Sequence, residues 1–172
     1  QVNENGILLN SGKEIEADIS ITATGFNLCV MGDIDFSMDG KTIDFSETVN
    51  YRGAMFTGIP NMAWIMGYLR SASWTLKVDL VAGFVSRLLN YMDQNKLETV
   101  HVALRPEDEN MQLEPWLDEE IFSPGYLKRD GHLLPKGGDK EEWRSSQDYW
   151  VEKDVLPLIN FDNSVFVYTE KH

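Results

Sequence analysis

The residues best suited to chemistry lie where a loop meets a helix, over Gly67–Thr75. Ser71, Ala72 and Ser73 precede a helical hydrophobic pattern, so a helix N-terminus is predicted at Trp74. Such a terminus carries roughly half a positive charge and several unpaired N–H groups, which can stabilise an anionic group. The small side chains would let the backbone approach a planar ring, while Trp74 would shield that ring or form a wall of a substrate pocket. Many helices begin this way without a ligand, so the pattern alone leaves both interpretations open.

Other kinds of site have little support in the spacing of residues. No Gly-x-Gly occurs, so neither phosphate-binding fingerprint of a dinucleotide-binding domain is present, and there is no Gly-x-Ser-x-Gly nucleophile elbow. His101, His132 and His172 lack a neighbouring Cys and HExxH-like spacing, so no metal site is expected. The acidic residues of Asp33–Asp44 lack the order of a calcium loop, and those of Glu107–Asn110 are predicted to be solvated.

The helix that must position the junction has the clearest pattern in the chain. Its apolar side chains recur at i, i+3, i+4 and i+7 from Trp74 to Met92. Ser73 or Ser71 is the expected N-cap, and Asn95 the expected stop. The continuously apolar run Met62–Met66, which precedes the loop, predicts a buried strand.

Turn-forming residues predict two β-hairpins. One surrounds Asn10–Lys13, and the other surrounds Asp39-Gly40, a dipeptide typical of type I′ turns. Further short strands are expected at residues 18–23, 54–56, 100–104 and 165–168, and short helices within residues 114–129 and 140–156. The elements together predict the α/β class, with antiparallel hairpins and one long helix.

Composition limits the range of partners. The 172 residues are 42% hydrophobic and 25% charged, as expected of one folded domain. The net charge of −13 would repel nucleic acids and anionic membranes. The uncharged run Gly53–Leu69 contains Pro60 and falls short of the roughly 20 apolar residues of a membrane span, so no transmembrane segment is predicted.

The single cysteine indicates the redox compartment of the protein, and the first residue bears on whether the chain is a fragment. Cys29 excludes an internal disulfide and suits a reducing, cytoplasmic location, and its apolar neighbours predict that it is buried. The chain starts with Gln1, not Met, and lacks a signal-peptide pattern, which predicts a trimmed chain or a fragment.

Two stretches carry a family resemblance. The run GIPNMAWIMGYLRSASWTLKVDLVAGFVSRLLNYM at Gly58–Met92 and the motif IleThrAlaThrGlyPhe at Ile21–Phe26 resemble the C-terminal part of class B flavoprotein monooxygenases, the flavin-containing and Baeyer–Villiger enzymes. Within this family the chain is most similar to the ethionamide-activating type. The resemblance covers about residues 15–95 and continues more weakly over Pro115–Trp150. Both Gly-x-Gly-x-x-Gly loops, the fingerprint between them and the arginine that serves oxygenation have no counterpart in this chain.

The resemblance implies a partial FAD/NAD(P)-binding fold, from an enzyme with two dinucleotide-binding domains and the cofactors FAD and NADPH. Residues 1–26 would end the NADPH-domain region with the AlaThrGly connector, residues 27–110 would be the returning part of the FAD-binding domain, and residues 111–172 would be a subfamily-specific C-terminal segment. Glycine after a strand is usually only a turn. In this family, however, Thr24 and Gly25 would lie near both cofactors. The residues implied to contact the flavin are Gly67, Ser71, Ala72, Ser73, Trp74 and Thr75.

The activity implied for the parent enzyme is insertion of one oxygen of O2 into a ketone, or its addition to nitrogen or sulfur of a small amine or sulfide. This chain alone lacks both ADP-binding loops, so it is predicted to be inactive and to have no catalytic residue of its own. A non-catalytic module that self-associates through open sheet edges is the alternative. A flavin disulfide reductase relative is disfavoured because no Cys-x-x-Cys is present.

Overall fold

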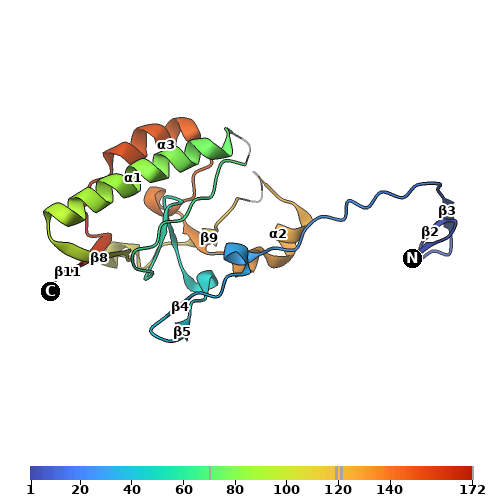
Figure 1. The fold of residues 1–172 in the computed structure, drawn as a ribbon, viewed down its shortest axis with the longest axis horizontal. Helices are drawn as coiled ribbons and strands as arrows, with labels where there is room; N and C mark the ends of the chain where they lie inside the picture. The colour runs from blue at the N-terminus through green and yellow to red at the C-terminus, as the bar shows by residue number, and fades with distance from the viewer. Residues whose placement is uncertain (70, 119, 121, 172) are drawn as a thin grey trace.

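The longest element is helix α1, Trp74–Gln94, which lies along one side of the molecule (Figure 1). It is part of a computed structural model that describes residues 1–69, 71–118, 120 and 122–171. Asn95 caps its C-terminal end, so the predicted helix and its stop are confirmed. One face of the helix is buried and consists of Lys77, Val81, Phe84, Leu88 and Met92.

Helix α1 packs against a two-stranded antiparallel sheet of β8, Leu97–Val102, and β11, Phe166–Glu170. Phe166 pairs with Val102, and the register shifts at the end of the ladder between Thr169 and Glu170. Both strands were predicted. Their pairing was not, because it joins segments that are far apart in the sequence.

The remaining strands form short antiparallel ladders. Asp39 and Gly40 have φ angles of 52° and 74°, the positive values that a type I′ turn requires, and both predicted hairpins are confirmed. The strands are β1 (Val2–Asn3), β2 (Gly6–Leu8) and β3 (Glu14–Glu16) in one sheet, and the pairs β4 (Ser37–Met38) with β5 (Lys41–Thr42), β6 (Asn50–Tyr51) with β7 (Met55–Phe56), and β9 (Leu113–Pro115) with β10 (Lys136–Gly138).

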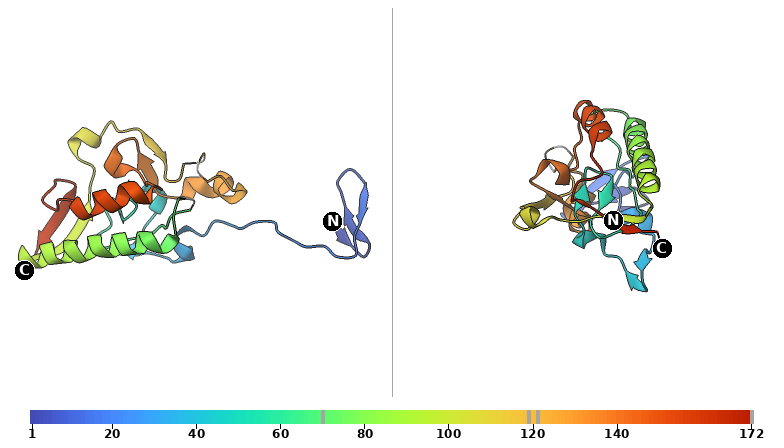
Figure 2. Two further views of the ribbon diagram at one scale, coloured as in Figure 1. Left: turned by 90° about the horizontal axis from the view of Figure 1, so that it is seen from above. Right: turned by 90° about the vertical axis from the view of Figure 1, so that its left-hand side faces the viewer.

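Two short α-helices follow in the last third of the chain, α2 (Gly125–Asp130) and α3 (Tyr149–Val155). Both are much shorter than the ranges predicted for them. Helix α3 lies beside α1 (Figures 1 and 2). Single 3₁₀ turns occupy Phe45–Glu47, Pro106–Asp108, Gly131–Leu133, Glu141–Trp143 and Leu156–Leu158. The turn at Val30–Asp33 contains residues with positive φ angles, Met31 at 50° and Gly32 at 72°.

Two hydrophobic clusters form the core. The larger lies between α1, the β8–β11 sheet and the 3₁₀ turn that follows α3, with Phe84, Trp143 and Phe166 among its buried residues. The smaller comprises Met31, Phe45, Phe56, Ile59, Trp116 and Leu134. Each cluster draws on both the middle and the last third of the chain, so the last third is part of the core and not an appended tail.

The N-terminal hairpin stands apart from this body, at the end of an extended segment formed by residues 17–29 (Figures 1 and 2). Ile19, Ile21 and Phe26 are 81%, 89% and 76% exposed. The strand predicted for residues 18–23 is therefore wrong for this chain. The alternating pattern is present, but a strand also needs a partner to bond its backbone, and the described part of the chain supplies none.

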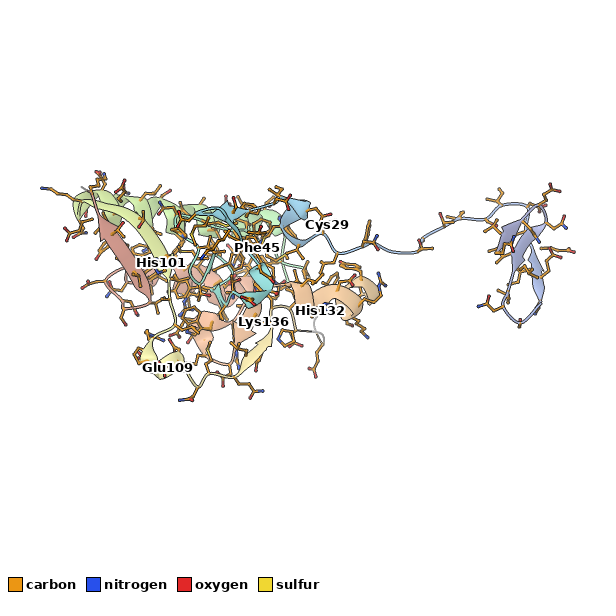
Figure 3. All side chains as sticks on the ribbon, turned by 90° about the horizontal axis from the view of Figure 1, so that it is seen from below. Cys29, Phe45, His101, Glu109, His132 and Lys136 are labelled. Carbon is orange, nitrogen blue, oxygen red and sulfur yellow. The ribbon has the colours of Figure 1, made fainter. Side chains whose placement is uncertain are left out.

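Three further predictions were wrong. Met62–Met66 is half-buried extended chain without a ladder, with Trp64 N donating to Ala54 O at 2.8 Å. Cys29 is exposed, where the extended segment meets the body (Figure 3). Asp108 is buried, and its carboxylate forms ion pairs with the side chains of Arg105 and Lys140. Apolar neighbours in sequence did not bury Cys29, and acidic neighbours did not expose Asp108, since both depend on distant contacts.

No helix in the described ranges is long and apolar enough to cross a membrane. Within the same ranges, no group of three or more His, Cys, Asp or Glu side chains is arranged to hold a metal ion.

Candidate functional site

The loop before α1 folds back onto the first residue of the helix. Gly67 is buried, and a Cβ atom there would lie 2.1 Å from Cδ2 of Trp74, well inside van der Waals contact. Only glycine fits at this position while the indole keeps its place. Gly67 therefore has a packing role, which is to let Trp74 lie against the loop.

The N-terminus of α1 is open: within the described residues, no side chain accepts a hydrogen bond from its first backbone N–H groups. Ser73 occupies the N-cap position, but its hydroxyl does not accept a backbone N–H and instead lies 3.0 Å from Thr75 Oγ1. Ser71 donates its hydroxyl hydrogen to the carbonyl of Gln147. Ser73 is therefore the N-cap residue, as predicted, but the predicted hydrogen bond from a backbone N–H to a serine hydroxyl is absent from the described residues. As a result, no serine hydroxyl blocks the positive end of the helix dipole, and Ser71, Ser73, Trp74 and Thr75 are exposed around it.

The last third of the chain holds the loop in place. The side-chain oxygen of Gln147 accepts a hydrogen bond from Leu69 N at 2.8 Å, and its backbone carbonyl accepts from Ser71 Oγ. The Tyr68 hydroxyl donates to the Glu152 carboxylate. Three residues of the loop are thus bonded to residues about 80 positions later.

A buried ion pair lies beneath this loop. Lys77 Nζ is 2.5 Å from Glu152 Oε1, with side chains only 1% and 4% exposed. Lys77 also donates to the Arg52 carbonyl at 3.3 Å. Burial lowers the pKa of the Lys77 ammonium, against the opposing effect of the Glu152 charge. Burial, and then the hydrogen bond to Glu152, raises the pKa of the Tyr68 phenol.

An apolar pocket of about 240 Å³ adjoins the junction. Trp64, Met66 and Trp74 line it, whereas Tyr68 is turned to Glu152. The remaining lining residues are Leu28, Cys29, Met31, Leu69, Trp116, Leu117, Phe122, Tyr126, Leu127 and Leu134.

A larger open cleft of about 1280 Å³ reaches the other side of the loop at Ser71 and Gln147. Among the described residues, the cationic lining residues are Arg52 and Arg144, and the acidic ones are Glu114, Asp118, Asp139, Glu141, Asp148 and Glu152. An excess of carboxylates disfavours a pyrophosphate there. The described lining of the cleft therefore does not suit a phosphate group.

The other predicted site residues lie elsewhere. Thr24 and Gly25 are exposed on the extended segment; Gly25 has a φ of 91°, and no atom lies within 4 Å of where its Cβ would be. Beside them, Phe26 contacts Tyr126 edge to face, and its carbonyl accepts from Arg129 at 3.3 Å. No hydrogen bond joins Thr24 or Gly25 to the Ser71–Thr75 junction in the described ranges.

The residues that hold the junction were not identified from the sequence. Lys77 carried a signal, since it lies four positions before Val81 on the apolar face of α1, where a charge requires a buried partner. Gln147 and Glu152 carried none, because their contacts arise from the tertiary fold.

Comparison with curated proteins relates the chain to FAD-containing monooxygenases. It is 49% identical over 144 residues to the FAD-containing monooxygenase EthA of Mycobacterium tuberculosis, a match that covers 84% of this chain and 28% of that protein. It is 44% identical over 159 residues to EthA of Mycolicibacterium smegmatis, covering 92% of this chain and 30% of the relative. It is 37% identical over 168 residues to the probable FAD-binding monooxygenase AlmA of Acinetobacter baylyi, covering 98% and 33% respectively.

These matches confirm the resemblance. The chain is similar to part of these FAD-containing monooxygenases, and it spans about three-tenths of the length of these relatives. No family model matches the chain. No solved structure matches it either.

Proposed function

We propose that the chain is the C-terminal portion of an FAD- and NADPH-dependent monooxygenase, which inserts one oxygen of O2 into a ketone or adds it to nitrogen or sulfur of a small organic substrate. The observation that carries this proposal is the open N-terminus of α1 beside an apolar pocket, in a chain 49% identical to part of an FAD-containing monooxygenase. Bound FAD would supply the reaction with O2, and NADPH would supply the electrons.

In this proposal the junction holds one edge of the flavin ring. Ser71, Ala72, Ser73 and Thr75 present small side chains and the positive end of the helix dipole to that edge, where negative charge is stabilised on the reduced ring. Trp74 forms a wall beside the ring, and Gly67 allows that wall to lie against the loop. Thr24 and Gly25 belong to the connector between the two nucleotide-binding domains.

The proposed domain division follows the family. Residues 1–26 end the NADPH-domain region, residues 27–110 complete the FAD-binding domain, and residues 111–172 form the C-terminal segment. The chain alone has no ADP-binding loop, so we propose that it is inactive by itself. A cytoplasmic location is part of the same proposal.

A chimera tests the function. The matching 144 residues of Mycobacterium tuberculosis EthA are replaced by those of this chain, and bound FAD, NADPH oxidation and the product from an uncharged ketone are measured. We expect the chimera to hold FAD and to oxygenate the ketone. The relative without this segment and the 172-residue chain with added FAD serve as inactive controls. A folded chimera that holds FAD but forms no oxygenated product would show the proposal to be wrong.

A charge change tests the flavin contact in that chimera. Ser73→Asp places a negative charge at the N-terminus of α1, and we expect the flavin reduction potential to become more negative. Ser86→Asp, on the exposed surface of the same helix, is the matched control and should leave the potential unchanged. Equal potentials in the two variants would argue against contact between the junction and the flavin.

A non-catalytic, self-associating module is the second candidate, and one observation favours it. Ile19 and Ile21 are exposed on an extended segment that has no strand partner in the described part of the chain. A second copy could supply that partner. Sedimentation of the chain would then show a dimer that Ile19→Lys with Ile21→Lys dissociates; a monomer would exclude this candidate.

A further inference from the structure

The apolar pocket has the dimensions of a small-molecule site. Its volume is about 240 Å³. A dry cavity of about 150 Å³ is enough to bind benzene, and drug-sized ligands use roughly 300–1,000 Å³. The pocket therefore suits one ring with a short substituent, or a short aliphatic chain.

The side chains around the pocket select against charge. Every lining residue in the described ranges is aliphatic, aromatic, Met or Cys. A charged ligand would lose its hydration without gaining an ionic partner. The indole N–H groups of Trp64 and Trp116 have no acceptor among the described residues, but they are shielded from solvent and offer no accessible donor. The pocket thus recognises an uncharged molecule mainly by its shape.

The pocket is built jointly by three parts of the chain. Leu28 and Cys29 come from the end of the extended segment, and Met31 comes from the turn that follows it. Trp64, Met66, Leu69 and Trp74 come from the chain that leads into α1 and from its first residue. The largest share comes from the last third of the chain: Trp116, Leu117, Phe122, Tyr126, Leu127 and Leu134. Trp116 is held edge to face by Phe56 at 5.7 Å, so this wall is anchored in the smaller core cluster.

The pocket also shares residues with the candidate flavin junction. Trp74 is the first residue of α1, and Leu69 belongs to the loop that Gln147 holds. A molecule in the pocket would lie against the same indole and loop that border the open helix N-terminus.

We infer that this pocket binds the apolar body of a small, uncharged ketone or sulfide substrate, and that its lining residues from the last third of the chain determine which sizes of substrate fit. The identification of the ligand as a substrate rests on the proposed function. The pocket and its preference for uncharged rings are properties of this chain and do not depend on that function. Leu127 and Leu134 set the size of the pocket from the side that the last third of the chain supplies.

Ligand binding to the 172-residue chain tests the inference without any cofactor. The probes are 4-fluoroacetophenone, which is uncharged, 4-fluorobenzoate and 4-fluorobenzylammonium, observed by the line width of their ¹⁹F NMR signals. We expect the ketone to bind at least about tenfold more tightly than either ion, a difference of about 1.4 kcal/mol. The net charge of −13 repels the anion but not the cation. Weak binding of both ions would therefore show that the pocket itself excludes charged ligands. Equal binding of all three probes, or no binding of the ketone, would overturn the inference.

Variants locate the binding. Leu127→Trp fills the pocket and should weaken ketone binding at least about tenfold, whereas the same change at Leu89, 59% exposed on α1, should leave it unchanged. Leu134→Ala is the second pocket variant, in case Leu127→Trp does not fold; it enlarges the pocket and should tighten binding of the larger ketone 6-fluoro-2-acetonaphthone. Ketone binding that responds to neither pocket variant would place the ligand elsewhere and refute the inference.

The results separate this inference from the proposed function. If the EthA chimera oxygenates a ketone but the chain and its variants show no selective binding, the pocket assignment fails and the function stands. If the chain binds the ketone as expected but the folded chimera forms no product, the pocket stands and the monooxygenase proposal fails.

Discussion

Lys77 and Glu152 form a buried ion pair, 2.5 Å apart, that joins the first turns of α1 to α3. Glu152 also accepts a hydrogen bond from Tyr68, so one carboxylate holds both the helix and the loop before it. The position of the candidate flavin junction thus depends on the last third of the chain, the part that the family resemblance covers more weakly.

Breaking this pair should be costly. Glu152→Gln leaves the Lys77 charge buried without its partner, and we expect a loss of about 3–5 kcal/mol in the free energy of unfolding. Replacing both residues, by Lys77→Met with Glu152→Leu, should restore part of that loss because no unpaired charge remains. Urea unfolding measures each value. Lys171→Met, which breaks the exposed pair with Asp93, is the control and should cost under about 1 kcal/mol. Equal losses of unfolding free energy for Glu152→Gln and Lys171→Met would contradict a buried ion pair between Lys77 and Glu152.

The contact between Gly67 and Trp74 predicts a double-mutant result. Gly67→Ala forces its Cβ into the indole and should cost about 1–3 kcal/mol of stability. In a Trp74→Ala background the clash is gone, so the same change should cost under about 0.5 kcal/mol. Gly83→Ala is the matched control, since no atom lies within 4 Å of its Cβ position in mid-helix, and it should stabilise by about 0.5–1 kcal/mol. Additive losses for Gly67→Ala and Trp74→Ala would mean that the two residues do not pack together.

Gln147 should control the local stability of the loop. Gln147→Ala removes the acceptor for Leu69 N, and we expect faster hydrogen exchange at that amide with a global loss of about 1 kcal/mol. Gln112→Ala makes the same change at an exposed position and should alter neither quantity. Unchanged exchange at Leu69 in Gln147→Ala would show that this bond does not hold the loop.

Asp108 should make the protein sensitive to acid. Burial alone would raise the pKa of its carboxyl, but hydrogen bonds from Arg105 at 2.8 Å and Lys140 at 2.6 Å outweigh burial and hold that pKa well below its usual range. A carboxyl with a lowered folded-state pKa stabilises the fold above its unfolded pKa of about 3.8, and this stability is lost as the pH falls further.

Asp108→Asn should therefore be less stable than the unchanged protein at pH 7, and its stability should vary less between pH 5 and pH 2. Urea unfolding at several pH values in this range measures both effects. Asp118→Asn, at an exposed position, is the control. If the stability of Asp108→Asn falls with acid as much as that of the unchanged protein, other carboxylates cause the acid sensitivity.

Cys29 should be accessible but slow to react. The thiol is exposed, and the hydrogen bond and negative charge of Asp33 raise its pKa, which lowers the thiolate fraction near neutral pH. Iodoacetamide should modify it in the folded protein, and Asp33→Asn should speed the reaction, roughly threefold for each half-unit fall in pKa. Asp35→Asn is the matched control. Protection of Cys29 from reagent in the folded chain would contradict the exposed position.

Local patterns predicted the local elements well. The apolar rhythm of α1 and its end at Asn95 follow from side-chain periodicity and capping, and the Asp39-Gly40 turn follows from the φ angles that these residues tolerate. The same reasoning failed for residues 18–23, which alternate, and for Met62–Met66, which are continuously apolar, because no strand in the described ranges pairs with either of them. A strand depends on its partner, whereas a helix bonds its own backbone.

The sequence by itself determined the family resemblance, the long helix and the loop of small residues that precedes it, because motif spacing and helical periodicity are properties of neighbouring residues. Tertiary structure alone decided what holds that loop and what lies beside it. The partners Gln147 and Glu152 and the pocket wall around Trp116 reach the junction only when the last third of the chain packs against α1. Burial and ion pairing depend on contacts between distant residues, and spacing along the chain carries no record of them.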